Sequence, residues 1–88
     1  MLKKTLTIAN KLGLHARAAM KLVDTASRHT AKVTMIYKGI HCDAKDILQT
    51  MSLGAAYGAN VDFEIEGPDE ADSMQAITKL LEDKFGED

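Results

Sequence analysis

The amino-acid sequence predicts a two-layer α/β sandwich, in which helices cover one face of a β-sheet and water meets the other face. Four stretches alternate apolar and polar residues, and three repeat apolar residues at helical spacing, in the order βαββαβα. All the predicted strands are amphipathic, which is typical of a sheet with one solvated face. The length of 88 residues favours a single domain over residues 1–88.

The first strand is predicted around Leu6 and Ile8, because these two residues alternate with threonines. A helix is predicted from Ala16 to about Ser27, where the apolar spacing changes to three or four residues. The residues that we expect on its buried face are Ala16, Ala19, Met20, Val23 and Ala26.

A hairpin is predicted next, formed by a strand over residues 31–37 and a short strand from Ile40 to Cys42. Lys38-Gly39 provides the tight turn between them, because glycine tolerates a positive φ. A short helix from Ile47 to Leu53 follows the hairpin.

The ends of this short helix carry local signals. Asp46 is the expected N-cap, and Gln49, three residues later, completes a capping box. Gly54 suits the left-handed conformation that often ends a helix.

The fourth strand is predicted around Val61, Phe63 and Ile65, which alternate with acidic residues. Gly67-Pro68 is expected to end this strand. Asp69 is the expected N-cap of the last helix. The residues that we expect on the buried face of this helix are Met74, Ile77, Leu81 and Phe85.

Composition and charge exclude several classes of protein. The chain is 45% apolar and 27% charged, with a net charge of −2, whereas nucleic-acid binders normally carry a clear basic excess. No apolar run is long enough for a membrane span or a secretory signal. The single Cys42 cannot form an internal disulfide. We therefore expect a cytoplasmic monomer that binds neither nucleic acid nor membranes.

His15 is the strongest candidate for chemistry, because it precedes the first predicted helix at the N-cap position. The first N–H groups of that helix, on Ala16, Arg17 and Ala18, form a natural anion site, and the Arg17 guanidinium suits phosphate. A neutral imidazole there is a competent nucleophile toward a phosphoryl group. The alternative is that His15 is only a mediocre cap and Arg17 a solvated helix residue.

The other two histidines carry no hypothesis. His29 lies in a polar loop and His41 on the predicted open face of the sheet, so we expect both to be solvated. The histidines and the cysteine lack metal-ligand spacing. We therefore predict no metal and no cofactor.

The segment from Gly13 to Ala19, Gly-Leu-His-Ala-Arg-Ala-Ala, closely resembles the active-site segment of HPr, the histidine-containing phosphocarrier family of the bacterial phosphoenolpyruvate-dependent phosphotransferase system. The segments 45–48 and 51–54 also look like that family. The resemblance covers nearly the whole chain. It implies an open-faced sandwich with a four-stranded antiparallel sheet covered on one side by three helices.

The resemblance implies a relay function. Enzyme I takes phosphate from phosphoenolpyruvate and passes it to Nδ1 of the family's histidine, here His15, which hands it to a histidine on a downstream IIA-type acceptor domain. Arg17 matches the arginine that neutralises the phosphate, and Ile47, Leu48 and Met51 match positions that dock on partners. The resemblance therefore predicts a phosphoryl carrier in sugar uptake or nitrogen-type regulation, not an enzyme.

Three residues depart from the family pattern. Ala18 replaces a common proline and restores an N–H donor at the site. Leu12 replaces a residue that is polar in sugar-system carriers, and Asp46 replaces a regulatory serine, so a seryl kinase has no hydroxyl there. The segments 10–13 and 85–88 look more like the nitrogen-related branch, often called NPr.

Two other classes of function stay open at this point. The first is a regulatory module that binds partners through Ile47, Leu48 and Met51 without being phosphorylated, although family members of that kind typically lack the histidine, which this chain has. The second is a small-ligand or metal-binding domain, which the spacing of cysteine and histidine does not support.

Overall fold

The structure, a computed structural model, describes residues 1–87 and has the predicted βαββαβα order. The last helix is followed by a 3-10 turn, η1. The elements are β1 (Leu2–Thr7), α1 (Ala16–Ser27), β2 (Lys32–Tyr37), β3 (Ile40–Asp43), α2 (Ile47–Ser52), β4 (Asn60–Glu66), α3 (Glu70–Glu82) and η1 (Lys84–Gly86).

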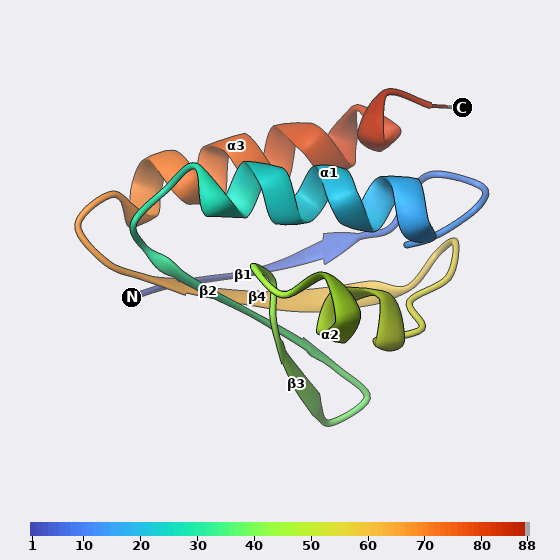
Figure 1. The fold of residues 1–88 in the computed structure, drawn as a ribbon, viewed down its shortest axis with the longest axis horizontal. Helices are drawn as coiled ribbons and strands as arrows, with labels where there is room; N and C mark the ends of the chain where they lie inside the picture. Colours follow the sequence, from blue (N-terminus) through green and yellow to red (C-terminus); the bar gives the residue numbers. More distant parts are fainter. Residues whose placement is uncertain (88) are drawn as a thin grey trace.

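The four strands form one antiparallel sheet in the order β1-β4-β2-β3. Helices α1 and α3 lie side by side over one face of it, and α2 packs against α1 and β3 (Figure 1). The open-faced sandwich is therefore confirmed. Within residues 1–87, no helix has the length and apolarity needed to cross a membrane.

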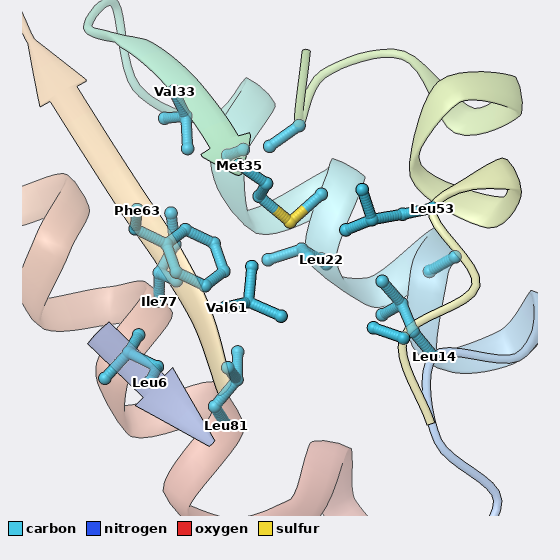
Figure 2. Packing of buried hydrophobic residues seen from close by; sticks show 14 of the residues in the cluster. Leu6, Leu14, Leu22, Val33, Met35, Leu53, Val61, Phe63, Ile77 and Leu81 are labelled. Carbon is cyan, nitrogen blue, oxygen red and sulfur yellow. The ribbon is translucent and has the colours of Figure 1, made fainter. Parts of the chain in front are cut away.

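The core lies between the sheet and the two long helices (Figure 2). Every second residue of β4 points into it, so that Val61, Phe63 and Ile65 are fully buried, as their alternation predicts. Leu22 from α1 and Ile77 from α3 meet them from above the sheet. This packing fixes the direction of α1, and with it the place of its first turn.

The buried face of α1 differs from the predicted one. Met20 is 62% exposed and Ala16 is also exposed. The buried residues are Ala18, Ala19, Leu22 and Ala26. The prediction is confirmed for Ala19 and Ala26 and was wrong for Ala16 and Met20, because α1 carries apolar residues on two adjoining stripes. The stripe with Leu22 and three small alanines lets the helix approach the sheet closely, so Met20 is left outside.

The cap of α2 forms as predicted, but the capping box does not. The Asp46 carboxylate accepts a hydrogen bond from the Gln49 N–H at 3.1 Å. The Asp46 N–H already donates to the Asp43 carbonyl, so the Gln49 side chain accepts instead from the Asp43 N–H at 2.8 Å. Gly54 has the expected positive φ, 72°. The helix is therefore fixed at both ends.

Asp69 occupies the N-cap position of α3, yet its side chain makes no capping bond. Its carboxylate accepts from the N–H groups of Thr30 and Ala31, both at 2.8 Å. The chain can approach this closely because residue 67 is glycine. A Cβ on Gly67 would lie 2.6 Å from the Ala31 Cα. Asp69 thus joins the start of α3 to the two residues just before β2.

Asp69→Asn is expected to make the protein less stable at neutral pH, with a difference that shrinks in acid. The hydrogen bond from Thr30, followed by that from Ala31, holds the pKa of the Asp69 carboxyl below its usual value. A lowered folded-state pKa stabilises the fold above the unfolded pKa of about 3.9 and loses that effect as pH falls through the folded value. Urea unfolding at neutral pH and at about pH 3 measures this difference.

Asp83→Asn is the matched control, because Asp83 is exposed at the other end of α3. If both variants show the same dependence of stability on pH, the contact of Asp69 with Thr30 and Ala31 has no energetic role.

Candidate functional site

His15 is the N-cap of α1, as predicted, with extended backbone angles (φ −76°, ψ 179°) and no side-chain capping bond. Its carbonyl accepts the first helical hydrogen bond, from the Ala19 N–H at 2.8 Å. The N–H groups of Ala16, Arg17 and Ala18 have no acceptor among residues 1–87. The imidazole therefore lies beside three free backbone donors at the positive end of a helix.

The loop before His15 is held by the segment that precedes β4. The Leu14 N–H donates to the Ala55 carbonyl at 2.9 Å, and the Leu14 side chain is buried. Gly13 has a φ of 69°, and a Cβ there would lie 2.9 Å from the Ala56 Cα. Only glycine fits at this position, so the approach of the chain to His15 is fixed.

Glu87 is the closest side-chain partner of His15. Its two carboxylate oxygens lie 2.9 and 3.0 Å from His15 Nε2, and Oε1 also accepts from Asn10 Nδ2 at 2.9 Å. The hydrogen bond from Asn10, followed by that from His15, lowers the pKa of the Glu87 carboxyl. An ionised carboxylate only accepts hydrogen bonds, so the hydrogen of the neutral ring lies on Nε2. Nδ1 is therefore the nitrogen that carries the free lone pair.

A left-handed turn after α3 brings Glu87 to this place. Lys84, Phe85 and Gly86 all have positive φ values, 56°, 56° and 74°. The Phe85 side chain is fully buried, in η1 rather than on α3 itself. The Lys21 ammonium donates to the Phe85 carbonyl at 2.6 Å. These contacts connect η1 to α1 and direct Glu87 to the start of that helix.

Sequence reasoning missed both Glu87 and Asn10. The pair of Glu87 and His15 is separated by 72 positions, and no periodic pattern connects them. The one local signal is a phenylalanine followed by glycine after the last helix, which is typical of a buried anchor at a turn.

The structure does not join the other predicted residues to His15. Arg17 is exposed, with no ion pair or hydrogen bond from its side chain to any residue from 1 to 87. His41 is exposed, as expected. His29 is half-buried, and its Nδ1 lies 3.1 Å from the Thr25 carbonyl oxygen, so the expectation that it is simply solvated was wrong.

Exposed apolar side chains lie on α1 and α2. Leu48 is 74% exposed and Met51 43%, whereas Ile47 is half-buried against the core. Met20 and Ile47 line one groove between the two helices.

Comparisons with known proteins agree on one family. A family model described as "PTS HPr component phosphorylation site" matches residues 2–83. The chain is 46% identical to "Phosphocarrier protein HPr" of Xylella fastidiosa over 88 residues, which cover 100% of this chain and 99% of that protein. It is 45% identical to the protein of the same name from Cupriavidus necator over 87 residues, 99% of this chain and 98% of that protein.

Solved structures give the same result. The HPr structure from Thermoanaerobacter tengcongensis titled HPr-C-His superimposes with a TM-score of 0.96 at 40% identity, covering 100% of this chain and 99% of that one. The phosphocarrier protein HPr from Bacillus anthracis gives 0.87 at 29% identity, covering 91% and 95%. The fold, the histidine at the N-cap position of α1 and these matches have one explanation: the chain belongs to the HPr phosphocarrier family of the phosphotransferase system.

Proposed function

We propose that this chain accepts a phosphoryl group from an Enzyme I-type protein on His15 and passes it to a histidine of a IIA-type acceptor domain. One observation carries the proposal: His15 lies at three free helix N–H groups with its Nε2 engaged by Glu87. This arrangement supports Nδ1 as the nucleophile, since Nδ1 has no partner among residues 1–87.

The transfer step is a displacement at phosphorus. The Nδ1 lone pair forms a bond to phosphorus while the bond between phosphorus and the donor protein breaks. The negatively charged phosphoryl oxygens come to lie where the N–H groups of Ala16, Arg17 and Ala18 have no other acceptor among residues 1–87. The imidazole ring gains positive charge, which is spread over both ring nitrogens. The Glu87 carboxylate, which accepts from the Nε2–H, stabilises that charge. Transfer to the acceptor reverses these changes.

Arg17→Ala is expected to slow phosphoryl transfer without abolishing it. Its exposed guanidinium is free to approach a phosphoryl group, and the helix N–H groups stay in the variant. We expect a loss of about a hundredfold, the lower end for removing one donor to a developing oxyanion. Quench-flow measurement of transfer from phosphorylated Enzyme I checks this.

Arg28→Ala is the matched control, because Arg28 is exposed after α1 and pairs with Asp24 at 2.6 Å, one turn back along the helix. Equal rates for the two variants would show that Arg17 is only a solvated side chain.

We propose that Met20, Ile47, Leu48 and Met51, which we call the docking patch, form the surface that binds both partners. Leu48→Asp is expected to cost about 1–2 kcal/mol of binding free energy toward Enzyme I, as for an apolar interface anchor. Its effect on stability should stay within about 0.5 kcal/mol, because Leu48 is 74% exposed. Titration calorimetry and urea unfolding measure the two quantities separately.

Ile40→Asp is the control for the patch, since Ile40 is 55% exposed at the end of β3 that follows the hairpin turn. Unfolding of Leu48→Asp with normal affinity in its folded fraction would mean that Leu48 supports the core instead of a partner.

The direct test is incubation with phosphoenolpyruvate and either a sugar-type or a nitrogen-type Enzyme I. We expect an acid-labile mass increase of one phosphate with at least one of them, and the faster one identifies the branch. Binding of both enzymes without any phosphorylation would instead favour a regulatory module that acts through the docking patch.

A further inference from the structure

Asn10 is a fully buried amide between β1 and α1 that the proposed mechanism leaves without a role. Its Nδ2 donates to the Gly13 carbonyl at 2.6 Å and to Glu87 Oε1 at 2.9 Å. Both partners only accept hydrogen bonds, so the amide cannot be turned over without losing both bonds. Its Oδ1 is buried without a partner among residues 1–87.

Asn10 contacts both the turn that precedes His15 and the Glu87 side chain that bonds to its ring. On one side, its side chain and its carbonyl, which accepts from the Gly13 N–H at 3.1 Å, hold the turn two residues before His15. On the other side, it binds Oε1 of Glu87, the oxygen that lies 2.9 Å from His15 Nε2. One amide therefore links the backbone and the side-chain support of the same imidazole.

The two hydrogen bonds from Nδ2 stabilise the fold, whereas the buried Oδ1, which has no partner among residues 1–87, offsets part of that gain. A buried acceptor without a partner destabilises the fold, and a leucine of similar shape would have no such group. Because both hydrogen bonds come from the same Nδ2, they allow only one arrangement of the two acceptors around the amide. The arrangement that Asn10 specifies is the position of the Glu87 carboxylate beside Nε2.

We propose that Asn10 is a positioning residue for phosphoryl transfer, which holds Glu87 on Nε2 and so presents Nδ1 of His15 as the attacking nitrogen. This inference rests on the function proposed above. Without the amide donor, Glu87 loses one of its two side-chain partners, and its carboxylate is no longer fixed against the ring.

The test uses Asn10→Leu, which keeps the approximate shape of the side chain and removes its donors. Asn60→Leu is the matched control, because Asn60 is exposed on β4 and bonds to the Thr7 hydroxyl at 2.7 Å. We expect Asn10→Leu to slow transfer from phosphorylated Enzyme I by up to about a hundredfold, the loss that a displaced reacting group produces. The control should keep the wild-type rate.

Two readouts separate positioning from a merely structural effect. The Glu87 carboxyl, followed by carbon-13 NMR, should titrate at higher pH in Asn10→Leu than in the wild type. The nitrogen-15 shifts of the His15 ring, measured at about pH 8.5 where free imidazole is neutral, should move toward a mixture of tautomers. Global destabilisation of a folded sample changes neither quantity.

A wild-type transfer rate in Asn10→Leu overturns the proposal, whatever the titration shows. If no Enzyme I phosphorylates the wild-type chain, the proposed function fails instead. In that case only the nitrogen-15 shifts of the ring test whether Asn10 positions Glu87 against His15. Unchanged shifts in Asn10→Leu would overturn that role.

Discussion

His15→Ala is expected to abolish phosphoryl acceptance while the chain remains folded. Among residues 1–87, the substitution removes the one candidate nucleophile that lies beside the free N–H groups of α1. The cost in folding free energy should stay below about 2 kcal/mol, the upper limit for a cap residue that does make a capping bond. His15 makes none, so its loss removes mainly the contact with Glu87. Mass spectrometry after incubation with Enzyme I and phosphoenolpyruvate measures acceptance, and circular dichroism reports the fold.

His29→Ala and His41→Ala are the matched controls, and both should accept phosphate as the wild type does. His29 Nδ1 already lies 3.1 Å from a backbone carbonyl oxygen, and His41 is on the open face of the sheet. Neither lies at the start of a helix. An acid-labile phosphate that persists in His15→Ala would contradict the assignment of His15.

Phe85→Ala is expected to cost about 3–5 kcal/mol of unfolding free energy, the range for removing a buried aromatic ring. Phe85 is among the largest fully buried side chains, although it lies beyond α3 in the left-handed turn. Since small domains have only about 5–15 kcal/mol in total, this loss is a large share. Urea unfolding followed by circular dichroism measures it.

The same substitution should also slow phosphoryl transfer, because the turn that holds Glu87 loses its anchor. Tyr57→Ala is the control, since Tyr57 is an aromatic residue that is 65% exposed, and it should change stability by less than about 0.5 kcal/mol. A similarly small change in Phe85→Ala would mean that the turn is not part of the core.

The sequence predicted those parts of the fold that depend on near neighbours in the chain. The alternation around Phe63 and the cap at Asp46 are local, and both appear in the structure as expected. The prediction that Met20 lies on the buried face of α1 was wrong because the helix has two adjoining apolar stripes. Only packing against the sheet decides that Leu22, and not Met20, is buried.

The candidate site shows the same division. The N-cap position of His15 follows from the end of one segment and the start of the next, so it was predictable. Glu87 and Asn10 were not, because their contacts depend on where the chain runs after α3. Asp69 is a second example: its position as N-cap was predicted, but its partners Thr30 and Ala31 are 39 and 38 residues away.

Because of the left-handed turn, the number of residues between Phe85 and Glu87 determines whether the Glu87 carboxylate reaches His15. Phe85 fixes one end of the segment in the core, and Glu87 reaches the imidazole only two residues later. One inserted residue would add about 3.3–3.6 Å of chain, more than the whole 2.9 Å between the carboxylate and Nε2. An insertion or deletion between Phe85 and Glu87 therefore changes the contact with His15 even when both of these side chains are kept. The number of residues in this segment is a constraint of its own, in addition to the identities of Phe85 and Glu87.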